Sequence, residues 1–282
     1  MDRIVFSAAI NKGNVDLETG VVPNASGSAY LELENPREPS QSINTVSPSL
    51  KLSCAIHGPK PLPRNANFSP NLQLTVNVKF APFATSRRRG YIRDTTERDI
   101  GTHLEAALNA VILPDRWPKS AIDIVITILE AEDDIRWDSR TQPKRVIEGI
   151  GNMNVVSGCI TVASAALVDA QIDCLGLVTG GVAAAVSQDD GKAVKMLDPS
   201  PFEEPSSSSV CAVGYLPTRD ELTLIWAKGD IPSNKNKDMR AFDSLLDSAV
   251  NAAKGAQVVL RQVTTELAQA QAARLTNNVP KT

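Results

Sequence analysis

The sequence has 282 residues, of which 42% are hydrophobic, and it carries a formal net charge of −3. This length allows one large core or two modest cores, and the slightly acidic total gives no general sign of a nucleic-acid-binding protein, although it says nothing about local basic patches. The N-terminal apolar patch is too short for a secretory signal, and no apolar run reaches the ~18 residues of a membrane span. We therefore expect a soluble intracellular protein with no membrane contact.

Two early segments are predicted to form a β-hairpin. Residues 27–34 alternate apolar and polar side chains, which is the pattern of a half-buried strand, and residues 50–58 form a second apolar strand. The connection, residues 35–49, is rich in proline, serine and asparagine. Such a composition predicts a long flexible insertion between the two strands.

A third strand and the first helix follow. Residues 72–80 have the cleanest alternation in the chain. After a basic turn, Asp94 and Glu97 have the spacing of a capping box, which predicts a helix start, and Pro114 ends the helical pattern. One apolar stripe of the predicted helix consists of Ile100, Leu104, Ala107, Leu108 and Val111.

The middle of the chain repeats the order of strand and helix. Residues 121–131 predict a buried strand, and residues 133–150 predict a second polar insertion. The stretch "GNMNVVSG", residues 151–158, precedes a helical pattern and is interpreted as an ordinary helix start with Asn154 or Ser157 as N-cap. The apolar face of that helix consists of Ile160, Ala163, Ala166, Leu167 and Ala170.

The last part of the chain predicts strands followed by one long helix. Two short strands are expected in residues 173–187, a loop in residues 198–209, and a hairpin in residues 210–229. Helical spacing over the last ~40 residues predicts a terminal helix, whose end at residues 264–275 should run past the core. The whole order predicts an α/β (α+β) domain with two βα halves and a mixed sheet.

The cysteines and histidines form no recognisable reactive site. The four cysteines (Cys54, Cys159, Cys174 and Cys211) lie in apolar runs and lack the spacing of a zinc site. We expect them to be buried free thiols of a reducing compartment. His57 and His103 are the only histidines, and no Ser/His/Asp or metal constellation can be assembled around them, so we expect structural roles.

Several segments, in this order and spacing, resemble the RNase PH family. They are "GSAYLELE", "LKLSCAIHGPK", "ERDIGTHLEAAL", "WPKSAIDIVITIL", "ITVASAALVDAQI" and "DPSPFEE". The resemblance covers roughly residues 17–260. It implies the RNase PH fold, which is ribosomal protein S5 domain 2-like, in one domain over residues 1–282 with two βα halves, mixed sheets and a long C-terminal helix. The two insertions and a helical extension at about 255–282 would be additions to that core.

The resemblance also implies where a phosphate site would lie. Active members of the family use inorganic phosphate to attack the 3′ end of RNA, and hold it with a Gly-Gly-Thr-Arg at the start of the second helix. Those four positions align with Met153, Asn154, Val155 and Val156. Valine has neither a side-chain donor nor a charge for a dianion. A second phosphate-contacting arginine of the family falls near Ile92, with Arg93 adjacent.

The acidic residues that the family uses for metal and proton handling are incomplete here. The first falls on Glu204, and the second falls near Ser208, where there is no carboxylate. A lone carboxylate is poor support for a divalent ion. We therefore predict no catalytic residues, no bound metal, no cofactor and no enzymatic activity of this chain.

A basic turn is the remaining candidate site. Arg87, Arg88 and Arg89 lie where the family has an arginine-bearing loop that guides RNA. Phosphate contacts from such a turn would position RNA without reading its sequence. The alternatives are a solvated turn or a contact with carboxylates of a neighbouring subunit.

The likeness is strongest to the eukaryotic exosome branch, in its small fungal type of ring subunit. It implies a non-catalytic subunit of a hetero-hexameric ring of RNase PH-like proteins, with S1/KH-type cap proteins and RNA in a central channel. The ring would support 3′-to-5′ RNA processing and decay, including rRNA maturation and mRNA decay by associated nucleases, in the nucleus, nucleolus and cytoplasm. The alternatives are an active phosphate-dependent 3′ exoribonuclease and an unrelated α/β binding protein.

Overall fold

A computed structural model describes residues 4–10, 13–34, 49–62, 69–85, 88–131, 151–187, 193–199, 207–229 and 238–277. The strands are β1 (Ile4–Ile10), β2 (Gly13–Thr19), β3 (Gly27–Glu34), β4 (Ser49–Pro61), β5 (Gln73–Phe80), β6 (Ser120–Glu130), β7 (Thr179–Ser187), β8 (Ala193–Leu197), β9 (Ser207–Leu216) and β10 (Glu221–Gly229). The helices are α1 (Thr95–Asn109), α2 (Gly151–Asp169) and α3 (Asp238–Asn277), with a short 3₁₀ helix at Pro114–Arg116.

The strands form two sheets. The larger sheet has the order β1-β2-β3-β4-β6-β5 and is antiparallel except for the β5–β6 pair, which α1 connects as a βαβ unit. The smaller sheet has the order β10-β9-β7-β8 and is antiparallel throughout. This arrangement confirms the predicted α/β (α+β) class, its mixed sheet and its long C-terminal helix.

The buried faces of the strands follow the sequence pattern. In β5 the residues Leu74, Val76, Val78 and Phe80 are buried, as their alternation predicts. The isoleucines of β6 at positions 122, 124, 126 and 128 are completely buried. Both strands therefore present one full apolar face to the core.

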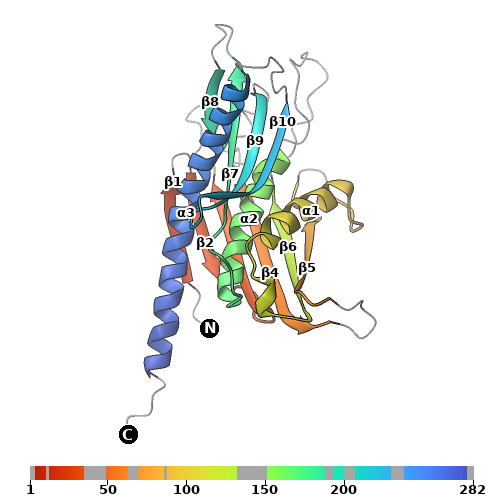
Figure 1. The fold of residues 1–282 in the computed structure, drawn as a ribbon, viewed down its shortest axis with the longest axis vertical. Coiled ribbons are helices and arrows are strands. Elements are labelled where there is room, and N and C mark those ends of the chain that lie inside the picture. The colour runs from red at the N-terminus through yellow and green to blue at the C-terminus, as the bar shows by residue number, and fades with distance from the viewer. Residues whose placement is uncertain are drawn as a thin grey trace.

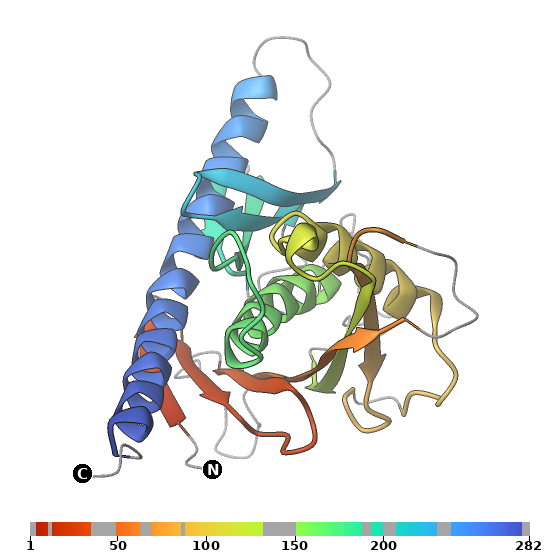
Figure 2. The ribbon, with the colours of Figure 1, turned by 60° about the horizontal axis from the view of Figure 1, so that its bottom comes forward.

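Helix α2 lies between the two sheets (Figures 1 and 2) and contacts β3 and β4 on one side and β7 and β9 on the other. By length and composition α2 could cross a membrane, so the expectation that no apolar run is long enough was wrong. However, 83% of the most apolar 18-residue stretch of α2 is buried inside the fold. A helix that is apolar all round is the expected centre of such a layered core.

Two adjacent glycines allow helices to pack closely on both faces of β7. A Cβ atom on Gly180 would overlap the backbone of Ser157 in α2, and one on Gly181 would overlap the backbone of Ala249 and Ala253 in α3. Successive residues of a strand point to opposite faces, so this pair brings α2 and α3 against the same strand from opposite sides.

Helix α3 runs along the small sheet and continues to the large one (Figure 1), where it contacts β1 and β2. Its side chains Val259, Leu260, Val263 and Leu267 are buried. The core therefore extends to Leu267, beyond the limit of about residue 260 that the family resemblance suggested.

Several details of the sequence-based prediction are wrong or incomplete. Strands β1, β2 and β8 were not predicted. Residues 173–187 contain one strand, β7, and a single bridge between Cys174 and Ile112, rather than two short strands. Of the predicted insertions and loop, residues 35–48, 133–150 and 200–206 lie outside the described residues.

Candidate functional site

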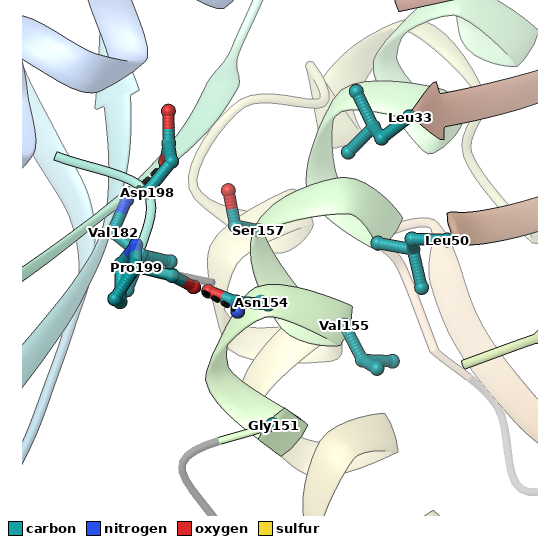
Figure 3. Close-up of a pocket in the computed structure, with 9 residues that line it drawn as sticks. All are labelled: Leu33, Leu50, Gly151, Asn154, Val155, Ser157, Val182, Asp198 and Pro199. Carbon is teal, nitrogen blue, oxygen red and sulfur yellow. Dashed lines mark hydrogen bonds between the residues drawn. The ribbon is translucent and has the colours of Figure 1, made fainter. Parts of the chain in front are cut away.

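A pocket of about 80 Å³ lies at the N-terminal turns of α2, where the family resemblance puts the phosphate site. The residues that line it are Leu33, Leu50, Gly151, Asn154, Val155, Ser157, Val182, Asp198 and Pro199 (Figure 3). They come from the large sheet, from the first turns of α2, and from β7 and the turn after β8. The pocket thus spans the gap between the two sheets.

Two polar side chains of the pocket, those of Asn154 and Asp198, are already used within the fold. The Asn154 side-chain amide donates a hydrogen bond of 3.1 Å to the carbonyl of Pro199. The Asp198 carboxylate accepts one of 3.4 Å from the backbone N–H of Val182, and the Asp198 N–H donates to the Val182 carbonyl at 2.9 Å. These bonds, drawn in part in Figure 3, tie the turn after β8 to α2 and to β7.

This pocket is poorly suited to a phosphate dianion. Its walls include the apolar Leu33, Leu50 and Val182, and its charged member, Asp198, is an anion that would repel another. No lysine or arginine of the described residues lines it.

The four positions aligned with the family's phosphate motif lie in α2, not in a loop. Helix α2 already begins at Gly151, so the prediction of Asn154 or Ser157 as N-cap is wrong. Met153 packs against the buried face of β7 and β9, while Val155 and Val156 belong to the main core. Because these three side chains are buried, the helix continues through the stretch instead of starting after it.

The predicted acidic positions cannot be compared in the same way. Glu204 lies outside the described residues, and Ser208 lies in β9, where the pairing with β7 shifts register. Within the described ranges, no group of three or more His, Cys, Asp or Glu side chains could hold a metal ion.

The basic turn divides into residues with different environments. Arg87 lies outside the described residues, and Arg88 is exposed. Arg89 is half-buried, and its guanidinium carbon lies 4.1 Å from the centroid of the Phe80 ring. The backbone N–H of Arg89 donates a hydrogen bond of 3.2 Å to the Pro82 carbonyl. Arg89 is thus held against the core by a cation–π contact, whereas Arg88 extends into solvent.

Lys79 and Glu97 hold the segment that carries these arginines. The Lys79 ammonium donates to the carbonyls of Gly90 and Ile92, each at 3.1 Å, and pairs with Glu97 at 3.2 Å. The Glu97 side chain is 1% exposed and also accepts from the N–H groups of Phe80 and Asp94, at 2.9 and 3.0 Å. The capping box that the sequence predicts is present, but the sequence did not reveal that Glu97 also binds β5.

The second predicted phosphate position lies on the same segment. Ile92 is 70% exposed and Arg93 is exposed, and neither lines the pocket at α2. Among the described residues, the structure therefore does not bring together the two halves of the phosphate site that the resemblance implies.

Three of the four cysteines and one histidine, His103, have the structural roles that the sequence predicts, whereas Cys174 is only partly buried. Cys54, Cys159 and Cys211 are buried free thiols, and burial raises the pKa of all four cysteines, that of Cys174 to about 12 and that of Cys211 to about 11. A thiol with a raised pKa is a poor nucleophile at neutral pH. His103 stacks on Trp226 with ring centroids 4.5 Å apart, which joins α1 to β10.

Comparison with known proteins settles the family. Residues 13–173 match the 3′ exoribonuclease family, domain 1, also called RNase PH, which is more than half of the chain. The chain belongs to the RNase PH family. The family prediction is thereby confirmed. The chain is 50% identical, over 89% of its length and 84% of the relative's, to the exosome complex component MTR3 of Chaetomium thermophilum.

Two further relatives and one solved structure are less similar to the chain. The chain is 27% identical to the exosome complex component mtr3 of Schizosaccharomyces pombe, over 76% of this chain and 70% of that one. It is 26% identical to the exosome complex component Rrp41 of Pyrococcus abyssi, over 88% and 81%. The crystal structure of rice Rrp46 superposes with a TM-score of 0.61 over 94% of both chains at 16% identity, which confirms the RNase PH fold.

Proposed function

We propose that the chain is a non-catalytic ring subunit of the RNA exosome that supports 3′-to-5′ RNA processing and degradation by associated nucleases. The observation that carries this proposal is the 50% identity over 89% of the chain to a fungal protein named as an exosome complex component. At that identity, and with nearly full coverage of both chains, a shared fold and a shared assembly are the natural expectation.

The absence of catalysis is supported by the burial of α2. Met153, Val155 and Val156 fill positions where active family members hold phosphate, and all three are buried among apolar neighbours. A dianion would lack both a guanidinium and flexible backbone donors there. The assembly needs the fold of such a subunit and not its chemistry.

The expected partners are other RNase PH-like subunits in a hetero-hexameric ring, S1/KH-type cap proteins, and RNA in the central channel. Of the two described arginines of the basic turn, Arg88 is the better placed to meet RNA phosphates, because it is exposed, while Arg89 packs on the Phe80 ring. The expected location of the assembly is the nucleus and nucleolus, and also the cytoplasm.

Co-purification tests the proposal. The tagged full-length chain, expressed in a fungal host, should bring down a stoichiometric set of RNase PH-like and S1/KH-type chains, which mass spectrometry would identify. A monomeric chain that captures none of them would overturn the proposal.

Phosphorolysis tests the absence of activity. The pure chain, incubated with single-stranded RNA and inorganic phosphate, should release no nucleoside diphosphates. Release of nucleoside diphosphates that requires added inorganic phosphate, compared with a reaction without phosphate, would instead identify an active exoribonuclease.

A further inference from the structure

The segment between β5 and α1 combines exposed aromatic rings with positive charge. Among the described residues, five large hydrophobic side chains are strongly exposed, and three of them, Phe83, Tyr91 and Ile92, lie on this segment. Phe83 is 74% exposed and Tyr91 is 87% exposed. Exposed apolar side chains that are concentrated on one segment indicate an interaction site.

The charge of the segment points to a polyanion. From Lys79 to Arg93 the sequence contains no Asp or Glu, in a protein whose net charge is −3. The exposed cations among its described residues are Arg88 and Arg93. The first acid that follows, Asp94, accepts a hydrogen bond of 2.7 Å from the Thr95 N–H, so its charge is used to cap α1.

The segment is held in place before any ligand binds. Lys79 fixes the carbonyls of Gly90 and Ile92, which flank Tyr91, and the Arg89 N–H bonds to the carbonyl of Pro82, next to Phe83. The N–H of Ala131 donates to the Ala84 carbonyl at 2.9 Å, which ties the same turn to the end of β6. Phe83 and Tyr91 therefore each lie next to anchored backbone groups, and binding costs little ordering of the backbone at these two residues.

We propose that Phe83 and Tyr91 form a stacking platform for the bases of single-stranded RNA, with Arg88 and Arg93 contacting the adjacent phosphates. Proteins that bind single strands combine aromatic side chains, on which bases stack, with cations that follow the backbone. A duplex would not fit this platform, because its bases are already stacked on each other. The inference rests on the proposed exosome function for the source of the RNA, and it adds the class of substrate and the residues that hold it.

Equilibrium binding of the full-length chain to fluorescent oligoribonucleotides tests the platform. Three probes of equal length are compared: a single strand, the same sequence as a duplex, and an abasic ribose–phosphate strand. The double variant Phe83→Ala/Tyr91→Ala should bind the single strand about tenfold more weakly, while its binding to the abasic strand and its salt dependence stay unchanged.

Matched variants separate stacking from charge and from folding. Arg88→Ala should weaken binding to both single-stranded probes and lower the salt slope by about 0.7. Val258→Ala removes an equally exposed hydrophobic side chain from α3 and should change nothing. Phe83→Trp/Tyr91→Phe keeps both rings and should bind as the unaltered chain does.

Three results would overturn the stacking platform. The first is that the unaltered chain does not bind RNA at low salt, and the second is that the double variant loses equal affinity for the base-containing and abasic strands. The third is that the double variant keeps its RNA affinity but no longer co-purifies with a protein that the unaltered chain captures. The last result would identify a protein-docking surface. Co-purification of the unaltered chain with exosome subunits is scored separately, so a failed platform and a failed exosome assignment remain distinguishable.

Discussion

Glu97 shows how one buried side chain can organise a whole surface. Its carboxylate accepts hydrogen bonds from two backbone N–H groups and from Lys79, and so connects β5, the segment between β5 and α1, and the first turn of α1. From the sequence, the spacing of Asp94 and Glu97 predicts the helix start, because capping is a local interaction. The contact with Phe80 is made across 17 residues, and no local pattern encodes it.

Replacing Glu97 should destabilise the folded protein. Glu97→Ala leaves two backbone donors without their acceptor and releases Lys79, so we expect the free energy of unfolding to fall by about 2–3 kcal/mol. Asp99→Ala, at an exposed position of the same helix, should change it by less than about 0.5 kcal/mol. Urea unfolding of both variants checks this, and similar midpoints would contradict it.

The raised pKa of the Tyr30 hydroxyl predicts that the protein loses stability at high pH. Burial and a hydrogen bond of 2.9 Å from its hydroxyl to Glu32 raise the pKa of Tyr30 to about 12. The unfolded chain loses this proton near pH 10, so between about pH 10 and 12 the native state binds more protons and stability falls as the pH rises. Tyr30→Phe should show a shallower decline in that window, and its absorbance at 295 nm should lack the component that titrates near pH 12.

At the scale of elements, the sequence predicted those strands and helices whose side chains alternate cleanly or form one stripe. Strand β5 and helix α1 are examples, because each has one buried and one exposed face. Helix α2 was predicted to start too late, since its first turns are mostly buried and carry no single apolar stripe. The platform residues Phe83 and Tyr91 form no recognisable sequence pattern, because exposure is a property of the fold.

Strand β7 provides a test at this scale. Gly181→Ala would place a methyl group into the backbone of α3, and because backbone cannot move aside as a side chain can, we expect a loss of at least about 3 kcal/mol in the free energy of unfolding. Gly90→Ala, where nothing lies within 4 Å of the added carbon, should be almost neutral. Thermal unfolding of the two variants measures the difference, and equal melting temperatures would argue against close packing at Gly181.

At the scale of the whole molecule, α3 links the two sheets (Figure 2), since it contacts β7 and β9 in the small sheet and β1 and β2 in the large one. A chain that ends at Gln257 loses the buried Val259, Leu260, Val263 and Leu267. Each fully buried side chain of this kind contributes about 1.5–3 kcal/mol, so the sum approaches the whole stability of a typical domain. We expect this truncated chain to be insoluble or unfolded, whereas a chain that ends at Gln271 should express and melt cooperatively.

Under the proposed non-catalytic role, the burial of Val156 also has an evolutionary consequence. Where active relatives present an arginine to phosphate, this chain has a side chain with no solvent exposure, surrounded by apolar atoms. A single codon change that restored the arginine would place an unpaired charge in that environment and disrupt the fold before any activity returned. Under the proposed role, selection would remove such a mutation because it destabilises the fold. The protein would then remain a subunit of the assembly without regaining phosphorolytic activity.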